Sequence, residues 1–104
     1  MVDKTGERFY EAELYRLKGE LLLGLSTKNH AEAETCFHQA LDIARRQQAR
    51  SFELRAAVSL SRLWQCQGKR AAAHELLAAI YGWFSEGFET ADLREAKVLL
   101  EALA

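Results

Sequence analysis

Apolar residues recur at spacings of three and four along most of the chain. This spacing places them on one face of an α-helix, whereas a half-buried strand would show strict alternation. The chain contains no proline and many alanine, leucine, glutamate, arginine and glutamine residues, which favour helix. Five stripes follow the pattern: Tyr10, Leu14, Leu17, Leu21 and Leu25; Ala33, Phe37, Ala40 and Ala44; Ala57, Leu60 and Trp64; Ala73, Leu77, Ile80 and Phe84; Leu93, Ala96, Leu100 and Leu103. The sequence therefore predicts an all-α fold of five helices without strands.

Residues between the stripes indicate where helices begin and end. Asn29, followed three residues later by Glu32, forms a capping-box pattern, in which each side chain satisfies a free backbone amide of the first turn. We therefore expect the second helix to begin there. Ser51 is expected to cap the third helix, and Gly68 to end it, because glycine readily adopts the backbone conformation that closes many helices.

Two successive helix pairs have similar patterns. Ala33 in the first pair corresponds to Ala73 in the second, which gives a period of 40 residues. Gly19 and Ser61 are small residues in mid-helix, where glycine lowers helix propensity, so we expect each to permit close approach of the partner helix. We expect Ala33 to contact Gly19 in the first pair and Ala73 to contact Ser61 in the second.

The second pair resembles the tetratricopeptide repeat. The family pattern runs from an aromatic and a Leu-Gly pair through a turn glycine to alanine and phenylalanine on the second helix. The resemblance rests on Ala57, Leu60, Ser61, Trp64, Gly68, Ala73 and Leu77. It implies antiparallel helical hairpins stacked as a short solenoid in a single domain, residues 1–104. Repeat 1 would cover about 7–48, repeat 2 about 51–84 and a capping helix about 91–103.

The first repeat departs from that pattern. Lys18 stands where a leucine is expected before Gly19, and extra residues occupy the turn at 26–30. The period of 40 residues also exceeds the usual 34 or so. These departures suggest a divergent branch with longer second helices.

A broader resemblance covers most of the chain. "AEAETCFHQALDIARRQ" and "IYGWFSEGFETADLREAKVLLEAL" resemble the C-terminal helical tail of large bacterial signalling regulators, in which a nucleotide cyclase or DNA-binding domain and an AAA-type ATPase precede the tail. Only the tail matches, and the motifs of those enzymatic domains are absent from this sequence. The resemblance implies a regulatory tail as an alternative to a free-standing interaction module.

Composition and charge narrow the classes of partner. The 104 residues are 49% apolar and carry a formal charge of −1, as in an ordinary globular protein, and this charge predicts no binding to nucleic acid. The N-terminal stretch "MVDKTGERFYEAE" lacks the apolar core of a secretion signal, so we expect a cytoplasmic protein. "ARRQQAR" is interpreted as a helix C-terminus, where arginine favours the helix dipole. "LLLGL" is too short to span a membrane. Cys36 and Cys66 fall inside expected helices, which favours reduced thiols over a disulfide.

No motif for a reaction, cofactor or metal is found. "GELLLGLSTK" lacks the Gly-Lys-Ser/Thr order of a phosphate loop, and His30, His38 and His74 include no pair at the four-residue spacing that a helical zinc site needs. We therefore expect no catalytic residues, no cofactor and no metal. A small enzyme with a dispersed site remains the third alternative.

Charged residues on two helices suggest a binding groove. In tetratricopeptide proteins the first helix of each pair lines the concave surface, so the resemblance places six residues there. They are Glu13, Arg16 and Glu20 in the first helix and Arg55, Arg62 and Gln65 in the third. Arginine binds carboxylates in a bidentate manner, which predicts an acidic peptide or protein as partner. The alternative is a solvated face joined by Glu13–Arg16 and Arg16–Glu20 ion pairs.

The stretch "AIYGWFSEGFET" concentrates aromatic residues before the last helix. Tyr81, Trp83, Phe84 and Phe88 are interpreted as a seam that pins this helix onto the repeats, with an aromatic binding patch as the alternative. Arrays of two and a half repeats leave an apolar end, which predicts either a capping helix or association into a homo-oligomer.

Overall fold

The computed structural model describes residues 4–25, 27–82 and 91–103. Within these ranges the chain forms five α-helices and one 3-10 turn, and no strand, as the apolar pattern predicts. The elements are α1 (Lys4–Leu25), η1 (Thr27–Asn29), α2 (His30–Arg46), α3 (Arg50–Cys66), α4 (Arg70–Tyr81) and α5 (Ala91–Leu103). The all-α prediction is therefore confirmed for the part of the chain that the structure describes.

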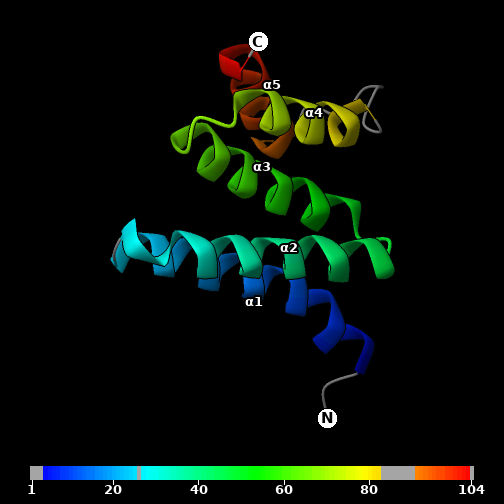
Figure 1. The fold of residues 1–104 in the computed structure, drawn as a ribbon. Helices are drawn as coiled ribbons and strands as arrows, with labels where there is room; N and C mark the ends of the chain where they lie inside the picture. The colour runs from blue at the N-terminus through cyan, green and yellow to red at the C-terminus, as the bar shows by residue number, and fades with distance from the viewer. Residues whose placement is uncertain (1–3, 26, 83–90, 104) are drawn as a thin grey trace.

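Consecutive helices pack against one another, so the fold is a stacked array with α1 and α5 at opposite ends (Figure 1). In addition, α3 contacts both α1 and α5. The first helices of successive pairs therefore lie in one layer, with α2 and α4 in the other. The array is a slab with extents of 45 × 38 × 20 Å. Such a slab exposes one broad face lined by α1, α3 and α5.

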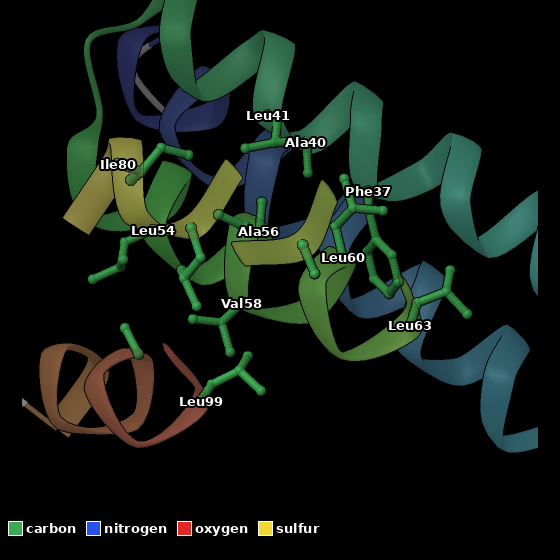
Figure 2. Packing of buried hydrophobic residues seen from close by; sticks show 14 of the residues in the cluster. Phe37, Ala40, Leu41, Leu54, Ala56, Val58, Leu60, Leu63, Ile80 and Leu99 are labelled. Atoms are coloured by element: carbon green, nitrogen blue, oxygen red, sulfur yellow. The ribbon is translucent and has the colours of Figure 1, made fainter. Parts of the chain in front are cut away.

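The core lies where α2, α3 and α4 meet, and Leu99 of α5 joins it (Figure 2). Its largest fully buried apolar side chains are Phe37, Leu54, Leu60, Leu77 and Ile80, each below 2% exposed. Burying such a side chain stabilises the fold by roughly 1.5 to 3 kcal/mol. The buried residues of α2 to α5 include most of those in the expected stripes, and α3 is buried on further sides as well, at Leu54, Val58, Ser59 and Leu63.

The inward face predicted for α1 is wrong. Leu14, Leu17, Leu21 and Leu25 are 63%, 44%, 69% and 78% exposed, respectively. The helix turns its other side inward, where Ala12 and Gly19 are buried and Tyr15, Leu22 and Leu23 are half-buried. The physical reason is Gly19, which lets the Phe37 ring approach the α1 backbone on this side.

The close approach expected at Gly19 is confirmed, with a different partner. A Cβ atom on Gly19 would lie 2.6 Å from Cε1 of Phe37, closer than two carbon atoms can pack. The absence of a Cβ atom on Gly19 therefore makes room for the ring of Phe37, rather than for Ala33. In the second pair, Ser61 is fully buried and its hydroxyl donates a 3.3 Å hydrogen bond to the carbonyl of Ala73, the expected partner.

Helix ends follow the predictions in part. The second helix begins after Asn29, but the expected capping box is wrong: the Asn29 amide donates to the Leu22 carbonyl at 2.9 Å and forms no cap on α2. Ser51 also does not cap, because α3 begins one residue earlier, at Arg50. Gly68 ends α3 as predicted, with φ at +81°, and the next amide, of Lys69, donates to Trp64 at 2.8 Å.

Candidate functional site: the hollow between α1 and α3

A three-residue ion cluster joins α1 to α3 in the exposed layer. Arg16 binds Glu13 in a bidentate manner, with Nε 2.7 Å from Oε1 and Nη2 3.0 Å from Oε2. Arg55 on α3 donates from Nη1 to the same Oε2 atom at 3.0 Å. Glu13 and Arg16 meet because they lie three residues apart on α1, whereas Arg55 reaches Glu13 because α3 packs against α1. One carboxylate thereby fixes the positions of two guanidinium groups.

The environment of Glu13 favours its charged form. Its side chain is 17% exposed, and the hydrogen bonds from Arg16 lower the pKa of this carboxyl below its ordinary value. Burial opposes this shift, while the charges of Arg16 and Arg55 add to it. The same hydrogen bonds raise the pKa of Arg16. Both groups are therefore ionised at neutral pH, and the cluster stays intact.

A hollow of about 210 Å³ opens beside this cluster. Its lining residues are Arg16, Arg55, Val58, Ser59, Arg62 and Glu95. Three cationic side chains thus face one carboxylate among the lining residues. Arg16 Nη1 lies 3.4 Å from the Ser59 hydroxyl oxygen, and Arg62 forms an ion pair with Glu95 of α5. Each guanidinium group already has a carboxylate partner, because Glu13 contacts both Arg16 and Arg55, and Glu95 contacts Arg62. The three cations exceed these two carboxylates by one charge.

The structure brings most of the six predicted groove residues together. Glu13, Arg16 and Arg55 are in direct contact, and Arg62 lines the same hollow. Glu20 approaches Arg16 at 3.9 Å. Gln65 is half-buried on α3 and is not among the residues that line the hollow.

The two ion pairs of the alternative interpretation are also present. Arg16 pairs with Glu13 three residues away and lies near Glu20 four residues away, as expected for a solvated helix face. That interpretation does not account for Arg55, whose bond to Glu13 spans 42 residues of sequence. The cluster is thus a tertiary contact between two helices.

Sequence reasoning missed three lining residues. Ser59 lies four residues after Arg55 and three before Arg62, so helical spacing alone could have placed it on the same face. Val58 is buried beside it. Glu95 comes from α5, and no local pattern connects it to α3.

A second hollow, of about 420 Å³, continues from the first. It shares Arg62 and Glu95 with the first hollow and is further lined by Arg94, Val98, Leu99 and Ala102. Val98 is 67% exposed there. The Arg62–Glu95 ion pair therefore stands between a cationic hollow and a more apolar one.

Only one residue of the predicted aromatic seam can be placed. Tyr81 is half-buried and packs at the edge of the core, while Trp83, Phe84 and Phe88 lie outside the described residues. Cys36 is buried and Cys66 is exposed, and both are free thiols. Across residues 4–25, 27–82 and 91–103, no three His, Cys, Asp or Glu side chains gather closely enough to hold a metal ion. No helix in these ranges has the length and apolar character to cross a bilayer.

Comparison with known proteins finds no matching family model, no matching curated protein and no matching solved structure.

Glu13→Gln should make the protein less stable at neutral pH by about 1 to 2 kcal/mol, because an amide cannot replace a carboxylate that accepts from two guanidinium groups. The lowered native pKa of Glu13 adds stability above its ordinary value of about 4.5, and this contribution is lost as the pH falls through the native pKa. Urea unfolding should show the difference between wild type and variant shrinking as the solution is acidified below about pH 4.5.

Glu20→Gln is the matched control. This side chain is 39% exposed and only 3.9 Å from Arg16, so its loss should change the free energy of unfolding by less than about 0.5 kcal/mol. Equal effects of the two variants at neutral pH would contradict the assignment of Glu13 as the central group.

Proposed function

We propose that the chain is a non-enzymatic protein-interaction module that binds an acidic peptide segment across α1 and α3. The observation that carries the proposal is the convergence of three guanidinium groups, from Arg16, Arg55 and Arg62, on one hollow. Guanidinium groups bind carboxylates through charge-assisted, often bidentate hydrogen bonds. Two of these groups are already oriented by Glu13, so less side-chain freedom is lost when a guest binds.

The size of the hollow supports a peptide side chain as the guest. Its volume of about 210 Å³ is below the roughly 300 to 1,000 Å³ of sites that enclose a whole small molecule. Arg16 Nη1 has the longest contacts within the cluster, at 3.4 Å to Ser59 and 3.9 Å to Glu20. A guest carboxylate near this nitrogen would gain a strong donor without breaking the Glu13 bonds.

The neighbouring hollow extends the proposed binding surface. A peptide crossing the Arg62–Glu95 ion pair would place an acidic residue beside Arg16 and a following apolar residue near Val98. The layer formed by α1, α3 and α5 supports a tetratricopeptide-like array, in which the first helices line the binding face. The free thiols are compatible with a cytoplasmic setting.

Fluorescence anisotropy with short labelled peptides tests the proposal. Wild type should bind an oligoglutamate peptide more tightly than an oligoglutamine peptide of equal length, with affinity falling as salt rises. The double variant Arg55→Gln/Arg62→Gln should weaken oligoglutamate binding about tenfold or more, because two donors are lost.

Arg46→Gln/Lys69→Gln provides the control, since it removes the same charge from exposed positions outside the hollow. This variant should retain wild-type affinity. Equal affinity of wild type for both peptides, or equal losses in the two double variants, would overturn the proposal.

A further inference from the structure

Four leucines form an exposed stripe along α1, on the side opposite Gly19. Leu14, Leu17, Leu21 and Leu25 are 44% to 78% exposed, and they are four of the five exposed large apolar side chains in the described part of the chain. We call these four residues the leucine stripe. A single exposed leucine is ordinary, but a continuous row on one helix indicates an interaction surface.

The spacing of the leucine stripe favours another helix as the occupant. Leu14, Leu17 and Leu21 follow the three-four spacing of a coiled-coil seam, and Leu25 continues the row. α1 has 22 residues, so it is about 33 Å long. A helix laid along the stripe could contact all four leucines, whereas a globular surface would touch only part of it.

The area of the stripe is substantial but limited. The four side chains together leave roughly 300 Å² of leucine surface in water, taking about 30 Å² for each fully exposed carbon. The largest apolar patch on a typical monomer covers about 300 to 600 Å². The four leucines of this one helix therefore reach the lower end of that range. A stable dimer buries about 800 Å² per partner, so flanking side chains must complete the interface.

The flanking charges identify the occupant. Glu11 and Lys18 are exposed, lie seven residues apart and therefore follow the same flank of the stripe. If two copies of α1 pair antiparallel with Leu14 of one beside Leu17 of the other, Glu11 of each copy lies near Lys18 of its partner. The stripe is therefore complementary in charge to a second copy of itself.

The other flank of the stripe is acidic, but nearby arginines offset part of its charge. Glu13 and Glu20 follow it, and in an antiparallel pair they would approach the same residues of the second copy. Arg16 lies 2.7 Å from Glu13 and 3.9 Å from Glu20, and Arg55 also contacts Glu13, so two guanidinium groups face the two carboxylates. The repulsion between two acidic flanks is thereby reduced.

We infer that the leucine stripe is the interface of an antiparallel, two-fold homodimer, with the axis between Leu14 and Leu17. Such isologous interfaces are the commonest in soluble oligomers, because one surface serves both subunits. The interface lies on a face of α1 different from the hollow. The dimer can therefore form whether or not the proposed peptide binding is correct.

Sedimentation equilibrium over a wide concentration range tests the dimer. Wild type should dimerise, and Leu17→Glu should raise the dissociation constant on the order of a hundredfold by placing two charges at the centre of the seam. The replaced side chain is 44% exposed, so circular dichroism and urea unfolding should show an unchanged monomer fold. A wild type that remains monomeric throughout would overturn the inference.

Charge exchange tests the antiparallel register. Glu11→Lys and Lys18→Glu should each weaken self-association about tenfold, because two attractive pairs become repulsive. An equimolar mixture of the two single variants should recover wild-type affinity as a heterodimer, since every pair then joins opposite charges. Association that persists but is insensitive to these exchanges would refute the two-fold pairing.

Discussion

Phe37→Ala should lower the free energy of unfolding by about 3 to 5 kcal/mol, the cost typical of removing a buried aromatic side chain. Phe37 is fully buried in the cluster that also contains Leu60 and Leu63 of α3 (Figure 2). Its ring also fills the space that Gly19 leaves on α1. The loss would open a cavity between α1, α2 and α3. Urea unfolding followed by circular dichroism measures the change in midpoint.

A double-mutant cycle with Gly19→Ala separates this contact from general loss of packing. In wild type, an alanine Cβ would lie 2.6 Å from the Phe37 ring, so Gly19→Ala should destabilise the protein. In the Phe37→Ala background the same change should stabilise it by up to about 1 kcal/mol, because alanine favours helix and its methyl group partly fills the cavity.

Gly24→Ala is the matched control for that cycle. It lies on the same helix, and nothing lies within 4 Å of the position its Cβ would take. This substitution should be neutral or slightly stabilising in both backgrounds. If Gly19→Ala had the same sign with and without Phe37, the proposed close approach would be refuted.

Arg45→Ala should destabilise the protein by about 2 to 3 kcal/mol. Glu53 on α3 is only 2% exposed, and Arg45 at the end of α2 donates to its carboxylate at 2.8 Å. Removing one partner of a buried pair leaves an uncompensated charge, which costs about 3 to 5 kcal/mol when both groups are buried. Because the Arg45 side chain is 50% exposed, water can replace part of the contact, which reduces the expected cost. Thermal or urea unfolding measures it.

Two further variants make this result specific. Arg46→Ala, at the adjacent exposed arginine, should change the free energy of unfolding by less than about 0.5 kcal/mol. Adding Glu53→Leu to Arg45→Ala should recover stability, because an apolar side chain of similar size removes the unpaired charge. No recovery in the double variant would show that the loss arises from another role of Arg45.

The sequence predicted the helices well and the orientation of α1 poorly. In α2, α4 and α5 the buried residues lie on one side, so their spacing determines which face is buried, whereas the buried residues of α3 surround the helix. On α1, leucines lie on both sides: Leu14 and Leu21 are exposed, while Leu22 and Leu23 pack against the core. The position of Gly19 decides between the two faces, and its importance becomes visible only when Phe37 is placed against it.

The candidate site was predictable where it depends on single helices. Helical spacing correctly grouped Glu13 with Arg16 and indicated the charged face of α3. It could not predict that Arg55 reaches across to Glu13, or that Glu95 pairs with Arg62 from α5. These contacts depend on how three helices pack, and no local pattern records that packing.

The central position of α3 has a consequence for unfolding. This helix contacts all four of the other helices. In longer repeat arrays each unit contacts only its neighbours, and the ends can fray while the middle stays folded. Here the loss of either end removes contacts from the same central helix, so unfolding should spread through the whole array. Amide hydrogens of α3 should consequently exchange with solvent only through global opening, and last among all the helices.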